Sequence, residues 1–140
     1  MMKRWLVLFT LILSGCASYQ ADKYGNYNDV ELTRQEAQVI AFDITTYLQQ
    51  TVGVKKIVNV DHDGSLFATT LTNTLRKSGI GVTQQQTAYN KLHYRVEFMN
   101  PTQFFVTVSI GSSHFSRIWA LQDNRLIPLP VRTIYGGEYE

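Results

Sequence analysis

Apolar residues recur every three or four positions in two stretches of the chain, which is the spacing of a helix with one buried face. In residues 33–50 these positions are Ala37, Ile40, Ala41, Ile44 and Leu48. Thr33 and Glu36 form a capping-box pair at the start of this stretch, and Gly53 follows its end. In residues 65–77 the apolar positions are Phe67, Ala68, Leu71 and Leu75. The pattern predicts two amphipathic helices that pack on a hydrophobic core.

Beyond Gly79 the hydrophobic period changes to two, which indicates strands with one buried face. Such strands are predicted over 80–83, 92–98, 104–110 and 114–121, and a β-branched run at 56–60 predicts one more between the helices. Residues 125–129 add an edge strand, because Pro128 and Pro130 lack the N–H that a central strand needs. This order (α-β-α-β-β-β-β) predicts an α+β fold, with two helices packed on one face of a mainly antiparallel sheet.

The first fifteen residues have the composition of a secretory leader. Lys3 and Arg4 precede an apolar run at 5–13, which is too short to span a membrane and is typical of a signal peptide. Leu13-Ser14-Gly15-Cys16 then resembles the bacterial lipobox. That resemblance implies cleavage before Cys16, a diacylglycerol on its sulfur and an acyl chain, such as palmitate, on its new amino group. An ordinary signal peptide cut nearby, or an uncleaved anchor, remains the alternative.

The chain therefore divides into a lipoprotein signal peptide (1–15), a lipidated linker (16–32), a periplasmic α+β domain (33–132) and a tail (133–140). Ala17 stands where lipoproteins retained in the inner membrane often carry Asp, so the resemblance implies the periplasmic face of the outer membrane of a Gram-negative bacterium. Of the 13 Lys and Arg, two lie in the leader, which leaves 11 against 11 Asp and Glu. This neutral balance gives no support for nucleic-acid binding.

Candidate chemistry is sparse. Asp61-His62-Asp63-Gly64 resembles the start of a calcium loop, but the twelfth position, which needs Glu, is Thr72. A turn followed by a helix start, capped by Asp63 or Ser65, is the other interpretation. His62, His93 and His114 show no metal-ligand spacing, and Ser109, Ser112, Ser113 and Ser116 show no nucleophile elbow. We expect no enzyme activity, no metal, no cofactor beyond the covalent lipid and no small-molecule substrate.

Two further sets of residues are candidates for contact with a partner protein. Phe105 and Met99 lie on the predicted polar side of the sheet and are candidates for a partner surface, or for packing under a loop. Arg95 and Arg117 could pair with Glu97 or with a partner, or could be solvated.

Four stretches carry a resemblance to a known family. They are TRQEAQVIAFDITTYLQQ at 33–50, DGSLFATTLTNTLRKSGIGV at 63–82, LHYRVEF at 92–98 and VTVSIGSSHFSRIWALQDNRLIPLPVR at 106–132. Together they resemble the TrbH-type conjugal transfer lipoproteins of type IV secretion (mating-pair formation). The resemblance implies a structural or assembly component that contacts other transfer proteins, with Cys16 as the one functional position carried over. A cell-wall synthase activator, a secretion pilotin, and a hydrolase or metal binder using Asp61, His62 and Asp63 are the alternatives.

Overall fold

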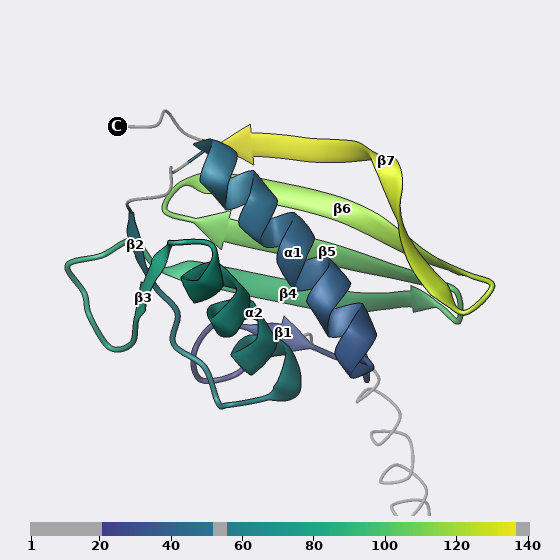
Figure 1. Cartoon of the computed structure of the whole chain (residues 1–140), viewed down its shortest axis with the longest axis horizontal. Helices are drawn as coiled ribbons and strands as arrows, with labels where there is room; N and C mark the ends of the chain where they lie inside the picture. The colour runs from purple at the N-terminus through teal and green to yellow at the C-terminus, as the bar shows by residue number, and fades with distance from the viewer. Residues whose placement is uncertain (1–20, 52–55, 137–140) are drawn as a thin grey trace, which may run out of the picture.

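The computed structural model describes residues 21–51 and 56–136. In these residues a five-stranded sheet, in the order β1-β4-β5-β6-β7, carries two helices on one face, and β2 and β3 form a second, two-stranded sheet (Figure 1). The helices are α1 (Arg34–Thr51) and α2 (Leu66–Lys77). The strands are β1 (Tyr27–Asn28), β2 (Ile57–Asn59), β3 (Gly81–Thr83), β4 (Leu92–Asn100), β5 (Gln103–Ile110), β6 (Ser113–Gln122) and β7 (Arg125–Gly136). The predicted α+β class is confirmed.

Both helices begin at the predicted caps. At α1 the Thr33 N–H donates to Glu36 Oε2 at 2.9 Å, and the Glu36 N–H donates to Thr33 Oγ1 at 3.2 Å, which completes a capping box. At α2 the Ala68 N–H donates to Ser65 Oγ at 3.3 Å. Gly79, which follows α2, has a φ of 92°, a conformation that glycine adopts without steric cost.

The core lies between the helices and the sheet, and aromatic pairs join the two layers. The Tyr47 ring on α1 stacks on Phe115 of β6 with centroids 4.4 Å apart, and Phe67 of α2 meets Tyr94 of β4 edge-on at 4.9 Å. On β5 the predicted alternation is confirmed, because Phe104, Val106, Val108 and Ile110 are buried and the residues between them are half-buried. The sheet therefore has one face under the helices and one face that no described helix covers.

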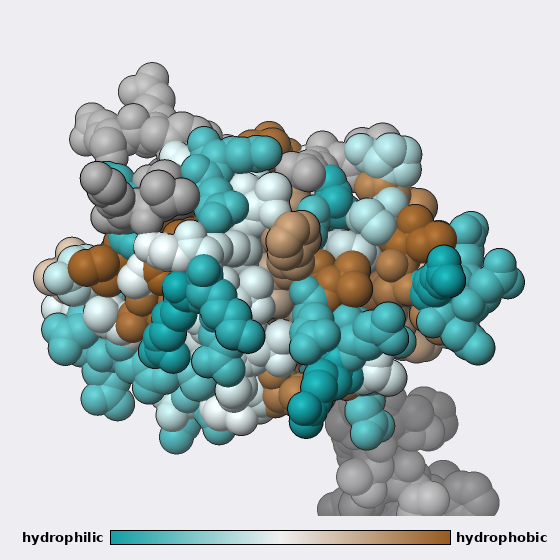
Figure 2. Space-filling view, viewed as in Figure 1, coloured by the Kyte–Doolittle hydropathy of each residue, from teal (hydrophilic) through white to brown (hydrophobic). Residues whose placement is uncertain are grey.

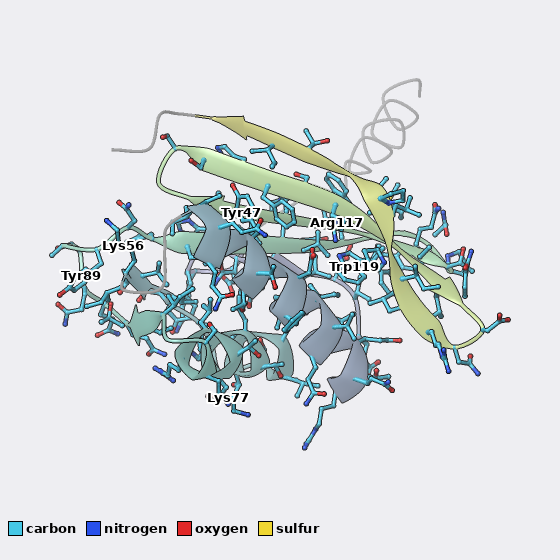
Figure 3. All side chains as sticks on the ribbon, turned by 45° about the horizontal axis from the view of Figure 1, so that its top comes forward. Tyr47, Lys56, Lys77, Tyr89, Arg117 and Trp119 are labelled. Carbon is cyan, nitrogen blue, oxygen red and sulfur yellow. The ribbon has the colours of Figure 1, made fainter. Side chains whose placement is uncertain are left out.

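Arg117 is part of this core, which the sequence analysis did not predict. It is 8% exposed, and its Nη1 donates to Asp43 Oδ1 of α1 at 2.7 Å. Figure 3 shows Arg117 and Trp119 on the side of β6 that faces α1. A guanidinium can enter a core when a carboxylate neutralises it, so the expectation that Arg117 is solvated or pairs with Glu97 is wrong. Arg95 forms the predicted ion pair with Glu97.

The ordered domain begins before Thr33, because residues within the predicted linker join the sheet. β1 pairs in parallel with β4, Tyr27 opposite Arg95 and Asn28 opposite Val96. Val30 and Leu32 are buried in the hydrophobic core. The prediction of a linker up to residue 32 is therefore wrong for these residues. The prediction failed because β1 is held by pairing with a distant strand and has no hydrophobic period of its own.

The C-terminal strand also runs further than predicted. β7 follows β6 through a two-residue turn in which Asp123 and Asn124 have φ angles of 50° and 60°, the turn that matches strand twist. It continues past a register shift to Gly136, which pairs with Ser113. Residues 133–136 are thus strand and not tail. β7 occupies the sheet edge, as Pro128 and Pro130 predicted.

The strands on either side of α2 form a separate small sheet. β2 and β3 pair in parallel, with Val58 opposite Val82, so β2-α2-β3 is a crossover unit that stands apart from the five-stranded sheet. One bridge, between Asn59 and Lys91, links this unit to the chain just before β4.

Candidate interaction surfaces

The acidic cluster at residues 61–63 is occupied by structural hydrogen bonds. Asp61 Oδ1 accepts the Gln85 N–H at 2.6 Å, His62 Nδ1 accepts the Gly64 N–H at 3.0 Å, and Asp63 Oδ1 accepts the Ser65 N–H at 3.0 Å. These contacts shape the turn before α2 and fasten it to the loop after β3. The geometry supports the turn-and-cap interpretation of this segment.

The three histidines do not converge. His62 contacts Gln84 at 2.7 Å, next to the small sheet. His93 and His114 lie on either side of Ser109 in the main sheet, together with Arg95 in a shallow pocket of about 390 Å³. In residues 21–51 and 56–136 no group of three or more His, Cys, Asp or Glu side chains is placed to hold a metal ion.

The uncovered face of the sheet, here called the open sheet face, divides into a polar and an apolar end. Its side chains come from alternate positions of three strands: His93, Arg95 and Glu97 on β4, Phe105, Thr107 and Ser109 on β5, and His114, Ser116 and Ile118 on β6. At the polar end the Thr107 and Ser116 hydroxyls lie 3.1 Å apart. At the apolar end Phe105 lies between Glu97 and Ile118 and is half-buried. Met99 is exposed in the irregular end of β4.

A second surface lies on the helix side, between the start of α1 and the hairpin of β6 and β7. This α1–hairpin groove has a volume of about 810 Å³. Its apolar lining is Val39, Leu121 and Leu126, and its charged lining is Arg34, Glu36 and Arg125. Figure 2 shows apolar surface over α1 and over the neighbouring part of β7, interrupted by polar atoms.

The apolar surface continues along the outer side of α1, where the sequence analysis did not predict it. Phe42 is 69% exposed and Val39 is 36% exposed, and the two residues lie one turn apart. Their positions fall opposite the buried stripe of Ile40 and Ile44. A helical projection of residues 34–51 would have shown these two apolar residues on the polar face, and this is the signal that the sequence reasoning missed.

The pKa of Tyr94 is shifted, and the shift comes from its place in the structure. Burial raises the pKa of its phenol above the usual value of 10.0, a hydrogen bond with Ser65 lowers it in part, and the nearby carboxylates of Asp63 and Asp22 raise it. The phenol is thus held in its neutral form and packs between the sheet and the start of α2.

The fold and these surfaces define a small α+β domain with exposed apolar and charged surface and with its acidic cluster committed to backbone contacts. In a comparison with family profiles, that of conjugal transfer protein TrbH matches residues 19–134. The chain belongs to this family and is a component of conjugal transfer. Neither the curated proteins nor the solved structures contain a significant match. In the part of the chain that the structure describes, no helix is both long and apolar enough to cross a membrane.

Proposed function

We propose that this protein is a lipid-anchored component of the conjugative type IV secretion apparatus, held at the periplasmic face of the outer membrane, where it acts by binding other transfer proteins and not by catalysis. The observation that carries the proposal is the combination of the family match over 19–134 with Leu13-Ser14-Gly15-Cys16 behind a basic and apolar leader. The non-catalytic role is supported by the hydrogen bonds that commit Asp61, His62 and Asp63 to the backbone.

The lipid supplies the attachment. Each buried CH₂ contributes about 0.8 kcal/mol, so three acyl chains on Cys16 hold the protein far more firmly than the marginal single chain. The ordered domain begins close behind this anchor, because Asp22 already accepts the N–H groups of Tyr24 and Asn26. The six residues from Cys16 to Asp22 span at most about 20 Å when fully extended. The domain therefore works next to the bilayer and not at the end of a long tether.

The experiment tests attachment and transfer separately. In donor cells fed labelled palmitate, the wild-type protein and the neighbouring control Ser18→Ala should carry label and fractionate with outer membranes. Cys16→Ser should carry none and leave that fraction. An unlabelled wild-type protein would exclude the lipid anchor.

Deletion of the gene should reduce plasmid transfer to background, and the wild-type gene supplied in trans should restore it. Normal transfer by the deletion strain would exclude the transfer role. Chemical crosslinking distinguishes the binding classes, because adducts with cell-wall synthases or with another secretion pore would favour an activator or a pilotin.

A further inference from the structure

We propose that the α1–hairpin groove is the docking site for an acidic amphipathic segment of another transfer protein, in which apolar side chains are flanked by carboxylates. The identity of the partner as a transfer protein rests on the proposed function, whereas the chemistry of the segment follows from the groove itself.

The apolar lining of the groove requires an apolar ligand. Val39, Leu121 and Leu126 face a space of about 810 Å³, which is the size of a ligand-binding cleft. Phe42 extends this surface along the outside of α1, where an aromatic ring that is 69% exposed contributes nothing to the core. Aromatic and arginine side chains are the usual anchors of a protein interface. A segment that buried them would remove this apolar area from water.

The charged lining of the groove determines the sign of the charge that a partner must carry. Among the described residues neither Arg34 nor Arg125 has an ion-pair or hydrogen-bond partner, and both side chains are exposed at the groove. Glu36 is the one carboxylate in the lining, and it already accepts the Thr33 N–H of the capping box. The groove therefore offers two guanidinium groups to one committed carboxylate, and it favours a negatively charged ligand.

The position of Arg34 supports the same conclusion. It is the first residue of α1, where the positive end of the helix dipole disfavours a cation and favours an anion. A cation that opposes the local electrostatics, and that has no partner among the residues the structure describes, is suited to meet a carboxylate from outside. Nucleic acid fits poorly, because the lining between the arginines is apolar and lacks a continuous basic stripe.

The test places a photocrosslinking amino acid, benzoylphenylalanine, at Val39 of the full chain in donor cells that carry the complete transfer system. The matched control carries it at Asn73, an exposed position on α2 away from the groove. We expect an adduct at Val39 and none of the same mass at Asn73. Mass spectrometry of the adduct should map it to a segment with apolar residues and at least two Asp or Glu within about one helical turn of them.

Charge reversal then tests the selectivity. Arg34→Glu with Arg125→Glu should lower the yield of the Val39 adduct about tenfold. Arg76→Glu with Lys77→Glu, an equal change of charge at the end of α2, should leave the yield unchanged. An adduct with lipid, with a second copy of this chain, or with a segment that lacks carboxylates would overturn the proposal. So would the lack of any adduct, or a yield that the double reversal does not lower. The two proposals can fail separately. If the deletion strain transfers plasmid normally, but the full chain in donor cells still forms the adduct with an acidic segment, the docking chemistry stands and the transfer role fails.

Discussion

At the scale of single residues, the buried ion pair of Arg117 and Asp43 connects α1 to β6 of the sheet. Both side chains are removed from water, with exposures of 8% and 12%. Such a pair gains little over an apolar pair of the same volume, but the loss of one partner leaves an uncompensated buried charge. The contact therefore fixes where α1 lies on the sheet more than it adds to stability.

Asp43→Ala should lower the free energy of unfolding by about 3 kcal/mol, because the Arg117 guanidinium remains buried without its carboxylate. Urea unfolding followed by circular dichroism measures the loss. Gln38→Ala, on the exposed side of the same helix, should change stability by less than about 0.5 kcal/mol. The double variant Asp43→Leu with Arg117→Met should recover most of the lost free energy of unfolding. If Asp43→Ala and Gln38→Ala lowered the free energy of unfolding equally, the ion pair would be unimportant for stability.

Tyr94 should make stability fall at alkaline pH. Because burial raises the pKa of its phenol above 10.0, the folded state holds this proton more tightly than the unfolded state. The stabilisation is therefore complete below about pH 10 and is lost as the pH rises through the higher folded pKa. Tyr94→Phe removes this loss, so its urea midpoint should fall less steeply than that of the wild type above about pH 10. Parallel curves for the two proteins would contradict the assignment.

At the scale of elements, the shortest strand depends on one buried side chain. Asn26 is buried just before β1, and its Oδ1 accepts the Tyr94 N–H at 3.1 Å while its Nδ2 donates to the Asp61 carbonyl at 2.8 Å. Asp29 Oδ1 accepts the Phe98 N–H at 2.7 Å on the other side of β1. Side-chain oxygens thus continue the β4 ladder where the two-residue strand cannot, and they protect this edge of the sheet from pairing with other chains.

Asn26→Ala should therefore release β1 and lower the free energy of unfolding by about 2 kcal/mol, because the buried Tyr94 N–H and the part-buried Asp61 carbonyl lose their partners. Hydrogen exchange provides a local measurement, since the Tyr94 amide should exchange faster while amides in the middle of β5 keep their protection relative to global unfolding. Asn73→Ala on the exposed face of α2 is the control. Unchanged protection at Tyr94 would mean that β1 is held by its backbone alone.

The elements that the sequence predicted are those whose information is local. The capping box at Thr33, the cap at Ser65 and the alternation along β5 are each specified within a few residues, and each was confirmed. Asn26 contacts Asp61 and Tyr94, 35 and 68 residues away, and no local pattern specifies such contacts. Arg117 and Asp43 are 74 residues apart, and their pairing could not be predicted for the same reason. An arginine in an alternating strand has the same sequence pattern whether its partner is water or a carboxylate.

The candidate surfaces were predicted only in part, because one of them follows from local strand alternation and the other forms between segments that are distant in the sequence. Phe105 was placed on the polar side of the sheet from strand alternation, and the structure has it on the open sheet face. The α1–hairpin groove could not be predicted, because it exists only where the β6–β7 hairpin passes the start of α1. Its apolar lining comes from residues 39, 121 and 126, which are adjacent only in the fold.

At the scale of the whole molecule, two surfaces compete for the role of partner site. The open sheet face carries Phe105 and Ile118 at its apolar end, but Phe105 is half-buried by its neighbours. The helix side carries Phe42, which is 69% exposed, and the α1–hairpin groove, where Val39 is 36% exposed and two arginines lie beside the apolar lining. Since a binding residue must be accessible in the free protein and buried in the complex, the helix side is the better candidate.

The variants Phe42→Gln and Phe105→Thr distinguish the two surfaces, because each removes an aromatic ring from one of them. Gln is compatible with the helix at residue 42, and Thr is compatible with the strand at residue 105. Phe42→Gln should leave the urea midpoint nearly unchanged, because the ring is 69% exposed. It should lower plasmid transfer about tenfold or more, because the ring acts as an interface anchor. Phe105→Thr should lower stability modestly and leave transfer near the wild-type frequency. Mating assays with both proteins at matched expression measure the difference. The opposite result, with transfer lost in Phe105→Thr and kept in Phe42→Gln, would assign binding to the open sheet face and leave the groove without a role.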